Sequence, residues 1–451
     1  MKKTIFILFT FVIASCGPEL NLNPTTSVDS GQASKSVDLM VTAAYAMIGS
    51  GQGGALYSTD LLLNADLLAS EDYMQWRGTF DQYKEVSNKL MATTNGTVSR
   101  MWAQGYAAIN LTNTILVSLP NAAPADRDLF KGQALFIRGI VHFELLRFWM
   151  EPSTGLGVPL VTEPTVDFAT IKLPARATIA DCYTAIISDL TTAMSLLPTD
   201  NDVFANKYTA AAFLARVYLT KGDYANALAQ ANSVINSGKY SLPNSVEEAF
   251  NTYSSPESIF EIQQNTQNNA GTANDGLTTF YACDLSTPGS AGRGDVGIDP
   301  AFTSMYEPTD KRLSILIYTG DCNKASVTSA KWDNPYTNIP VIRLSEMLLI
   351  RAECNQRLAS AVGDTPLNDV NAIRSKAGAS SLGSVALSDI LLERELELAF
   401  EGQRIHDFKR VAKQITYNSS TLKYTDPQFI FPIPQSEINT NKNITQNSYY
   451  Q

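Results

Sequence analysis

The most regular part of this sequence is the stretch from residue 208 to residue 240, YTAAAFLARVYLTKGDYANALAQANSVINSGKY. Apolar residues recur at helical spacing on both sides of Lys221-Gly222-Asp223, which predicts two helices joined by a tight turn. Small residues lie where the two helices would approach closely, at Ala211, Ala215, Ala227 and Ala231. One such helical pair cannot bury its own apolar face, so other helices must pack against it.

The same periodicity predicts further helices along the chain. They cover residues 37–48, 98–119, 125–150, 178–197, 341–358, 366–377 and 388–413. The order Tyr218, Gly222-Asp223-Tyr224, Ala227 resembles a tetratricopeptide hairpin. The chain is therefore expected to be mainly α-helical.

The region from residue 241 to residue 338 has a different character. Two stretches rich in Gly, Asn and Ser, 265–276 and 286–297, are typical of loops, and short apolar stretches at 258–262 and 313–318 predict short strands. A long irregular region inside a compact protein is usually functional. The Pro- and Asn-rich tail, 431–451, is expected to lie extended over the surface.

The N-terminus has the pattern of a secretion signal. Residues 1–16 read MKKTIFILFTFVIASC, with two lysines before an apolar stretch at residues 4–14 that is too short to span a bilayer, which takes about 20 residues. Ile13-Ala14-Ser15-Cys16 resembles a bacterial lipobox, which implies cleavage before Cys16 and acylation of that cysteine. Acyl chains would tether the protein to a membrane. Ordinary secretion with an incidental cysteine is the alternative.

Composition excludes several classes of protein. With 34 Lys and Arg against 44 Asp and Glu, the formal charge is −10 and there is no basic run, so nucleic-acid binding is not expected. The only histidines are His142 and His406, which argues against a multi-histidine metal site and leaves little room for Ser–His catalysis. We therefore predict no metal and no cofactor.

A series of short motifs follows in order along almost the whole chain. They are Leu20-Asn21-Leu22-Asn23-Pro24 after Cys16, Ser188-Asp189-Leu190, Ile235 to Tyr240, Asp310-Lys311-Arg312, Arg343 to Glu346, Asn371 to Arg374, Glu393 to Leu398, Phe400 to Arg404, and Phe431-Pro432-Ile433-Pro434. Together they resemble the SusD/RagB family of nutrient-binding outer-membrane lipoproteins. One departure is the segment before Val158-Pro159-Leu160, which lacks the Gly-Gly that family members often have.

The resemblance implies a fold and a location. The fold would be a tetratricopeptide-like helical-hairpin scaffold with a loop-rich variable half. The divisions would be a signal peptide (1–15), a linker after the lipidated cysteine (16–30), a helical part (31–240), a variable ligand-binding part (241–338) and the C-terminal helices with their tail (339–451). The protein would be lipid-anchored in the outer membrane and would face the exterior.

The resemblance also implies a function without catalysis. The protein would bind oligosaccharides and deliver them to a TonB-dependent transporter of the SusC type. Two alternatives stay open: a peptide- or protein-binding component of such an importer, and a surface glycosidase.

Aromatic and polar residues outside the helical patterns are the candidate ligand-binding residues. Sugar rings stack on aromatic faces, while amides, carboxylates and guanidinium groups bind their hydroxyls. The first group is Tyr73, Trp76, Arg77 and Tyr83, and the second is Tyr281, Arg293, Trp332, Asp333 and Tyr336. Packing in the core is the alternative for each ring, and it is the expected role of Trp102 and Trp149.

An acidic segment near residue 397 was considered as an active site. Glu393, Glu397 and Glu401 would lie on one face of a single helix and need cationic partners, for which Arg343, Arg351, Arg394 and Arg404 are the candidates. Carboxylates among arginines have a lowered pKa and serve poorly as the acid of a glycosidase. We therefore interpret these residues as structural ion pairs.

Cysteine positions suggest one possible cross-link. Cys283 and Cys322 both lie in the variable half of an exported chain, so a disulfide between them is possible. Cys182 and Cys354 fall on helical patterns and are expected to be buried thiols.

Overall fold

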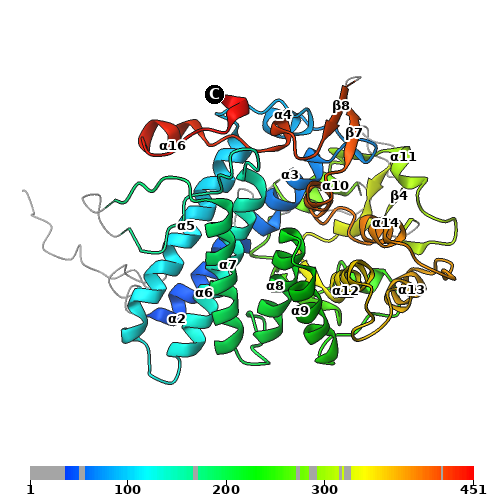
Figure 1. Cartoon of the computed structure of the whole chain (residues 1–451), viewed down its shortest axis with the longest axis horizontal. Helices are drawn as coiled ribbons and strands as arrows, with labels where there is room; N and C mark the ends of the chain where they lie inside the picture. Colours follow the sequence, from blue (N-terminus) through cyan, green and yellow to red (C-terminus); the bar gives the residue numbers. More distant parts are fainter. Residues whose placement is uncertain are drawn as a thin grey trace, which may run out of the picture.

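The computed structural model of the chain describes residues 36–49, 56–165, 171–270, 275–283, 292–313, 317–318, 327–417 and 420–451. Most of the molecule is a row of antiparallel helices, each packed against the next in the chain (Figure 1). The row consists of α5 (Gly96–Ser118), α6 (Arg127–Trp149), α7 (Ile179–Leu196), α8 (Lys207–Lys221) and α9 (Tyr224–Asn236), followed by α12 (Leu344–Leu358), α13 (Pro366–Ala377) and α14 (Leu387–Glu397). This row is the helical-hairpin scaffold that the periodicity predicts.

The turn between α8 and α9 shows why residues 208–240 form a hairpin. Gly222 ends α8 with a φ of 82°, in the left-handed region that glycine adopts at little cost. The Asp223 side chain then accepts a hydrogen bond from the Asn226 backbone N–H and caps α9. Asn206 and Thr209 form a capping box at the start of α8.

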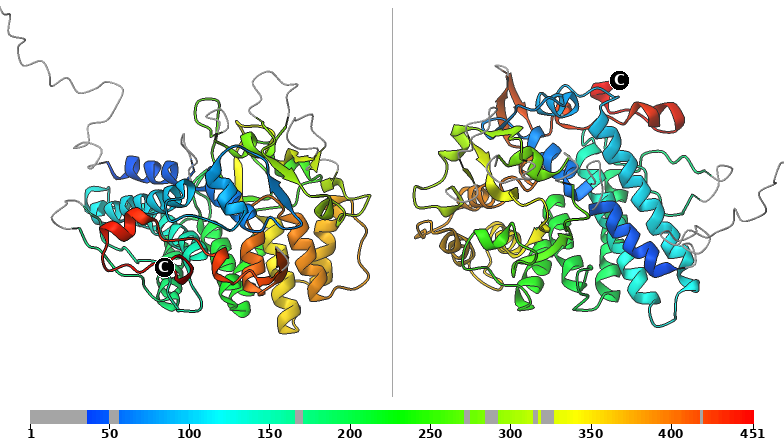
Figure 2. Two further views of the ribbon diagram at one scale, coloured as in Figure 1. Left: turned by 90° about the horizontal axis from the view of Figure 1, so that it is seen from above. Right: turned by 180° about the vertical axis from the view of Figure 1, so that it is seen from behind.

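Two early helices lie across this row. Helix α2 (Val37–Gly49) packs along α5 and α6 (Figure 2), and α3 (Asp60–Leu68) follows a short 3-10 turn, η2 (Leu56–Ser58). Every residue of α3 is buried. Its polar residues Asp60, Asn64 and Asp66 are buried too, so this short helix has no solvent-exposed polar face to mark it in the sequence.

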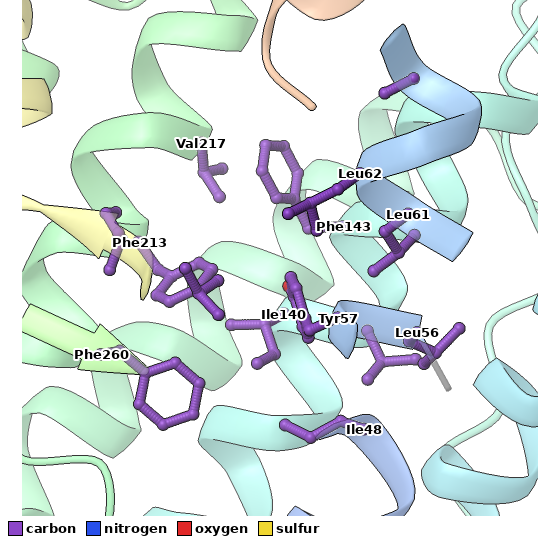
Figure 3. Close-up of a cluster of buried hydrophobic side chains, with 14 of the residues drawn as sticks. Ile48, Leu56, Tyr57, Leu61, Leu62, Ile140, Phe143, Phe213, Val217 and Phe260 are labelled. Carbon is purple, nitrogen blue, oxygen red and sulfur yellow. The ribbon is translucent and has the colours of Figure 1, made fainter. Parts of the chain in front are cut away.

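The largest hydrophobic core contains residues from both halves of the chain, from Val37 to Ile444. Figure 3 shows one cluster of side chains from α2, η2, α3, α6 and α8, with Phe260 of strand β2 (Ser258–Ile262) at one side of it; Phe260 contacts Phe136 of α6 and Phe213 of α8. Burying such side chains contributes about 1.5–3 kcal/mol each. The variable half is therefore packed on the helical scaffold and does not form a separate body.

The strands form four two-stranded antiparallel sheets within the described ranges. They are β1 (Met74–Trp76) with β3 (Val296–Ile298), β2 with β6 (Ile339–Arg343), β4 (Ile317–Tyr318) with β5 (Thr328–Ser329), and β7 (Gln414–Tyr417) with β8 (Ser420–Lys423). Short helices fill the connections: α4 (Asp81–Ser87), α10 (Leu277–Tyr281), α11 (Pro300–Thr303), α15 (Arg404–Arg410) and α16 (Gln435–Thr440). Trp76 pairs with Val296, so the first sheet connects residues far apart in sequence.

Two of the predicted helices, 341–358 and 388–413, are longer than the helices in the structure. Residues 341–343 pair with β2 as part of strand β6, and the helix begins only at Leu344. The stretch 388–413 is two helices, α14 and α15, because the chain turns between them at Phe400 (φ 62°) and Gly402 (φ 70°). A Cβ atom at Gly402 would lie 2.7 Å from the Cα of Leu62, so glycine permits the close approach to α3.

The tail was also predicted wrongly. Phe431 and Ile433 are completely buried, and the Trp149 indole N–H donates to the Pro432 carbonyl at 2.8 Å. Asn447 donates to the Phe431 carbonyl at 2.6 Å and accepts from Arg176 at 2.7 Å. The tail is therefore fixed against the end of α6, near the C-terminus in Figure 1, and it is helical at α16, where an extended chain was expected.

Across the ranges given above, no helix has both the length and the hydropathy needed to cross a bilayer.

Candidate ligand-binding site

Four of the predicted ligand-binding aromatics are internal. Tyr73, Tyr83 and Tyr281 are completely buried, and Trp332 is 5% exposed. Their burial argues against the prediction that these rings face a ligand, because each one packs and hydrogen bonds inside the protein.

Specific partners hold these four rings. Tyr73 stacks on Phe400 with a centroid separation of 5.0 Å, and the Trp332 indole N–H donates to the Phe400 carbonyl at 3.1 Å. The Tyr281 hydroxyl donates to Asp66 at 2.7 Å. The Tyr83 hydroxyl donates to Asp60 Oδ1 at 3.1 Å and accepts from Arg100 at 3.1 Å.

Trp76 differs from those rings because it is partly exposed. Its ring lies on β1, with its centroid 5.1 Å from that of Tyr83 and 5.6 Å from that of Phe280. The indole Nε1 has no hydrogen-bond partner in the structure. Gly78 makes room for the ring, since a Cβ atom there would lie 2.4 Å from Trp76 Cζ2.

Phe80 and Arg293 extend this surface. Phe80 is partly exposed, and its ring contacts Tyr83 and Phe280 at centroid distances of 6.3 and 6.2 Å. The Arg293 guanidinium lies 5.2 Å from the Phe80 centroid and contacts Asp295, and the arginine side chain is 28% exposed. We call Trp76, Phe80 and Arg293 the Trp76 surface.

Charged groups lie at the edge of the Trp76 surface. Asp60 fixes Arg100 through two hydrogen bonds of 2.7 and 2.8 Å, and Arg100 Nη1 lies 3.6 Å from Asp275 Oδ2. Burial raises the pKa of Asp275, while the charges of Arg100 and Arg293 oppose that shift. Arg100 and Asp275 are each partly exposed, so they add a hydrogen-bond donor and an acceptor to the aromatic rings.

The remaining candidates divide between two places. Arg77 is exposed beside Trp76, where its backbone N–H donates to the Asp295 carbonyl at 2.7 Å. Asp333 and Tyr336 are at least partly exposed in the segment after Trp332, where Tyr336 N–H donates to Asn334.

Four further residues lie around Trp76 that the sequence did not predict as ligand-binding. Phe80 and Phe280 lie close in sequence to the predicted residues Tyr83 and Tyr281, but nothing in the sequence places them beside Trp76. Arg100 and Asp275 gave no signal, since Arg100 lies on a helical pattern and Asp275 lies within the loop-like stretch 265–276.

The acidic segment is a buried ion-pair network. Glu397 contacts Lys376 at 2.6 Å, Arg312 at 3.0 Å and Arg343 at 3.1 Å. Glu401 contacts both Arg343 and Lys331 at 2.8 Å. Burial would raise the pKa of Glu397, but Lys376, Arg343 and Arg312 outweigh burial and hold it well below its usual range. A carboxyl group in this state stays ionised and does not act as a general acid.

The arginine partners differ in part from those expected. Glu393 pairs with Arg312 and Arg374. Arg394 pairs with Glu346 and Asp407, Arg404 with Glu395, and Arg351 with Asp369. The three glutamates do not share one helix face, because α14 ends at Glu397.

Both histidines, His142 and His406, are buried. His142 is 3% exposed, and burial together with Arg138 lowers its pKa to about 4.

Cys182 and Cys354 are buried free thiols, and Cys283 is disulfide-bonded. Cys322 and Cys16 lie outside the described residues, so the Cys283–Cys322 pairing and the lipidation remain predictions. In the part of the chain that the structure describes, no group of His, Cys, Asp and Glu is arranged to hold a metal ion.

Two family models match the sequence over most of its length. One, described as "Starch-binding associating with outer membrane", matches residues 24–219, and the other, described as "SusD family", matches residues 318–450. The chain is 26% identical to SusD-like protein P2 of Formosa agariphila, over 99% of both proteins. It is 30% identical to the starch-binding protein SusD of Bacteroides thetaiotaomicron over 130 residues, which is 26% of this chain and 22% of that protein.

Solved structures share the fold. A SusD superfamily protein from Bacteroides thetaiotaomicron superimposes with a TM-score of 0.81 and 25% identity, over 91% of this chain and 98% of the other. The surface glycan-binding protein A from Bacteroides uniformis, at 20% identity, superimposes with a TM-score of 0.77 over 92% and 99% of the two chains.

Proposed function

Because this chain belongs to the SusD/RagB family, we propose that it binds a glycan and delivers it to a TonB-dependent transporter of the SusC type. The family associates with the outer membrane, and its members bind ligands and are not enzymes. We propose further that Cys16 carries the lipid anchor and that the protein faces the exterior, where it meets its ligand.

The partly exposed ring of Trp76 is the observation that supports glycan binding most directly. Tyr83 and Phe280 pack against the ring in tilted and edge-to-face contacts and hold it in place, so little conformational freedom is lost when a ligand stacks on it. The partly exposed Arg100, Asp275 and Arg293 nearby supply hydrogen bonds of the kind that sugar hydroxyls require, while the indole N–H itself is buried.

The same groups argue against catalysis at this surface. Two carboxyl groups of a glycosidase must face the scissile bond, one of them protonated. Asp60 and Asp295 are completely buried against Arg100 and Arg293, so of the three carboxyl groups beside the Trp76 surface only Asp275 is partly exposed, and one carboxyl group is not the required pair. The proposed role is therefore binding without hydrolysis.

Replacing Trp76 by alanine tests this proposal. We expect the affinity for the bound glycan to fall about tenfold or more, because the stacking face is lost. Isothermal titration calorimetry with a panel of neutral oligosaccharides (maltoheptaose, laminarihexaose and xylohexaose) and with short peptides measures this. Chromatography of the same mixtures reports any hydrolysis.

The matched control is Tyr449→Ala, which removes an aromatic ring exposed at the end of the chain and should leave binding unchanged. Thermal unfolding checks that both variants fold. Unchanged glycan binding by folded Trp76→Ala would place the site elsewhere. Binding of peptides alone would favour the peptide importer, and turnover of a glycan would favour the enzyme.

Gly78→Ala should disturb the same ring without removing it. The new methyl group would lie 2.4 Å from Trp76 Cζ2 and 2.9 Å from Asp295 Cγ, so the indole must move. We expect several-fold weaker glycan binding and a changed tryptophan fluorescence spectrum. Gly383→Ala is the control, because no atom lies within 4 Å of a Cβ there. Equal affinities for the two variants would show that the position of the Trp76 ring is unimportant.

A further inference from the structure

Away from the Trp76 surface, a pocket lies between the C-terminal end of α6 and helices α8 and α15. Its walls are largely apolar, from Met150, Pro152, Ile430 and the ring of Tyr424, and it also exposes Lys409 and His406. We call it the Lys409 pocket. It shares no residue with the Trp76 surface, so what it binds does not depend on the glycan proposal.

Among the described residues that line this pocket, Lys409 has no counter-charge when its amine is protonated. Its Nζ donates only to the backbone carbonyl of Arg147, at 3.3 Å, and no carboxylate among the described residues pairs with it. Nearby cations already have partners: Arg147 with Glu144, and Arg410 with Glu353 and Asp407. Burial and the charge of Arg147 lower the pKa of Lys409 to about 7. An ammonium group in this position lacks the counter-charge that buried cations normally have.

His406 adds a second polar group without a partner. It is 5% exposed, its Nε2 makes no hydrogen bond, and its ring packs edge-on against Phe148 at 5.0 Å. Buried polar atoms in native proteins are nearly always hydrogen bonded, so an unpartnered one beside an unpaired ammonium suggests that a ligand completes the pocket.

We propose that the Lys409 pocket binds a small organic anion, a monocarboxylate with an apolar body. The carboxylate would pair with the Lys409 ammonium, and the body would contact Met150, Pro152 and Ile430. A neutral ligand would leave the ammonium without a counter-charge. A multiply charged anion would exceed the single unpaired cation and would be poorly solvated by apolar walls.

The experiment compares acids with alcohols of the same shape on the full mature chain. The probes are hexanoate and phenylacetate, with 1-hexanol and 2-phenylethanol as neutral counterparts, in calorimetric titrations at pH 7 and millimolar concentration. We expect the acids to bind about tenfold or more tightly than the alcohols, because only they form a charge-assisted hydrogen bond. Lys409→Met should abolish this preference, and Lys442→Met, at an exposed lysine, should not.

A second variant keeps the proposal testable if Lys409→Met does not fold. Thr425→Trp retains the ammonium and fills the pocket from a partly exposed position, so it should weaken binding of hexanoate about tenfold or more. The proposal is overturned if none of the acids binds, if acids and alcohols bind equally, or if folded Lys409→Met or Thr425→Trp binds hexanoate as the parent chain does.

Discussion

Replacing Arg343 by methionine is expected to lower the free energy of unfolding by about 3–5 kcal/mol. Arg343 is 1% exposed and contacts three carboxylates: Glu257 at 2.6 Å, Glu397 at 3.1 Å and Glu401 at 2.8 Å. Without the guanidinium, these three negative charges would face one another in a region that water does not reach. Lys376 and Lys331 remain as partial compensation, which sets the lower end of the range.

Urea unfolding at pH 7 measures this effect. The matched control is Arg357→Met, whose partner Glu353 keeps Arg410 at 2.5 Å and whose own side chain is 21% exposed. That change should cost less than about 1 kcal/mol. If the two variants were equally stable, the buried ion pairs around Arg343 would contribute no more to stability than the partly exposed pair of Arg357 with Glu353.

Glu346→Gln should produce the second large loss, with a distinct dependence on pH. Glu346 is 1% exposed and accepts from Arg216 at 2.6 and 3.0 Å and from Arg394 at 3.1 Å. Burial would raise the pKa of Glu346, but the two arginines outweigh burial and lower it from 4.5 to about 2. At 1.36 kcal/mol for each pKa unit, this shift corresponds to about 3 kcal/mol of stability at pH 7.

The sign of the pH dependence follows from that depressed pKa. The folded state holds the proton less tightly than the unfolded state, so the contribution of Glu346 is fully present above about pH 4.5. It is lost as the pH falls from 4.5 to 2. The stability difference between the parent chain and Glu346→Gln should therefore shrink over this interval, in chemical unfolding curves measured at each pH. Exposed Glu248→Gln serves as the control. A difference that stayed constant down to pH 2 would contradict the assignment.

The long helices were predictable from the sequence because their apolar residues recur at helical spacing over several turns. α13 begins at Pro366 and ends at Ala377, as the periodicity predicts. α3 was not predicted, since it has only nine residues and all of them are buried, including its polar residues Asp60, Asn64 and Asp66. The break after Glu397 was missed because it depends on contact with Leu62, more than 300 residues away, which local periodicity does not encode.

The candidate site was predictable as a segment but not ring by ring. Polar neighbours around Tyr73, Trp76 and Tyr83 made all three look alike in sequence. Their burial is decided by distant partners: Phe400 stacks on Tyr73, and Phe280 contacts both Tyr83 and Trp76. Composition therefore identifies where aromatic side chains gather, and tertiary packing selects which of them reaches the solvent.

Because β1 pairs with β3, the Trp76 surface is assembled only after both halves of the chain have folded. Trp76 comes from the first quarter of the chain, while Phe280 beneath it and Arg293 beside Phe80 come from beyond its midpoint. A nascent or proteolytically clipped chain that lacks the later segment has no assembled Trp76 surface. On the proposed function, retention on an immobilised glycan would thus report the integrity of the whole fold, and an incomplete copy would not compete for the glycan.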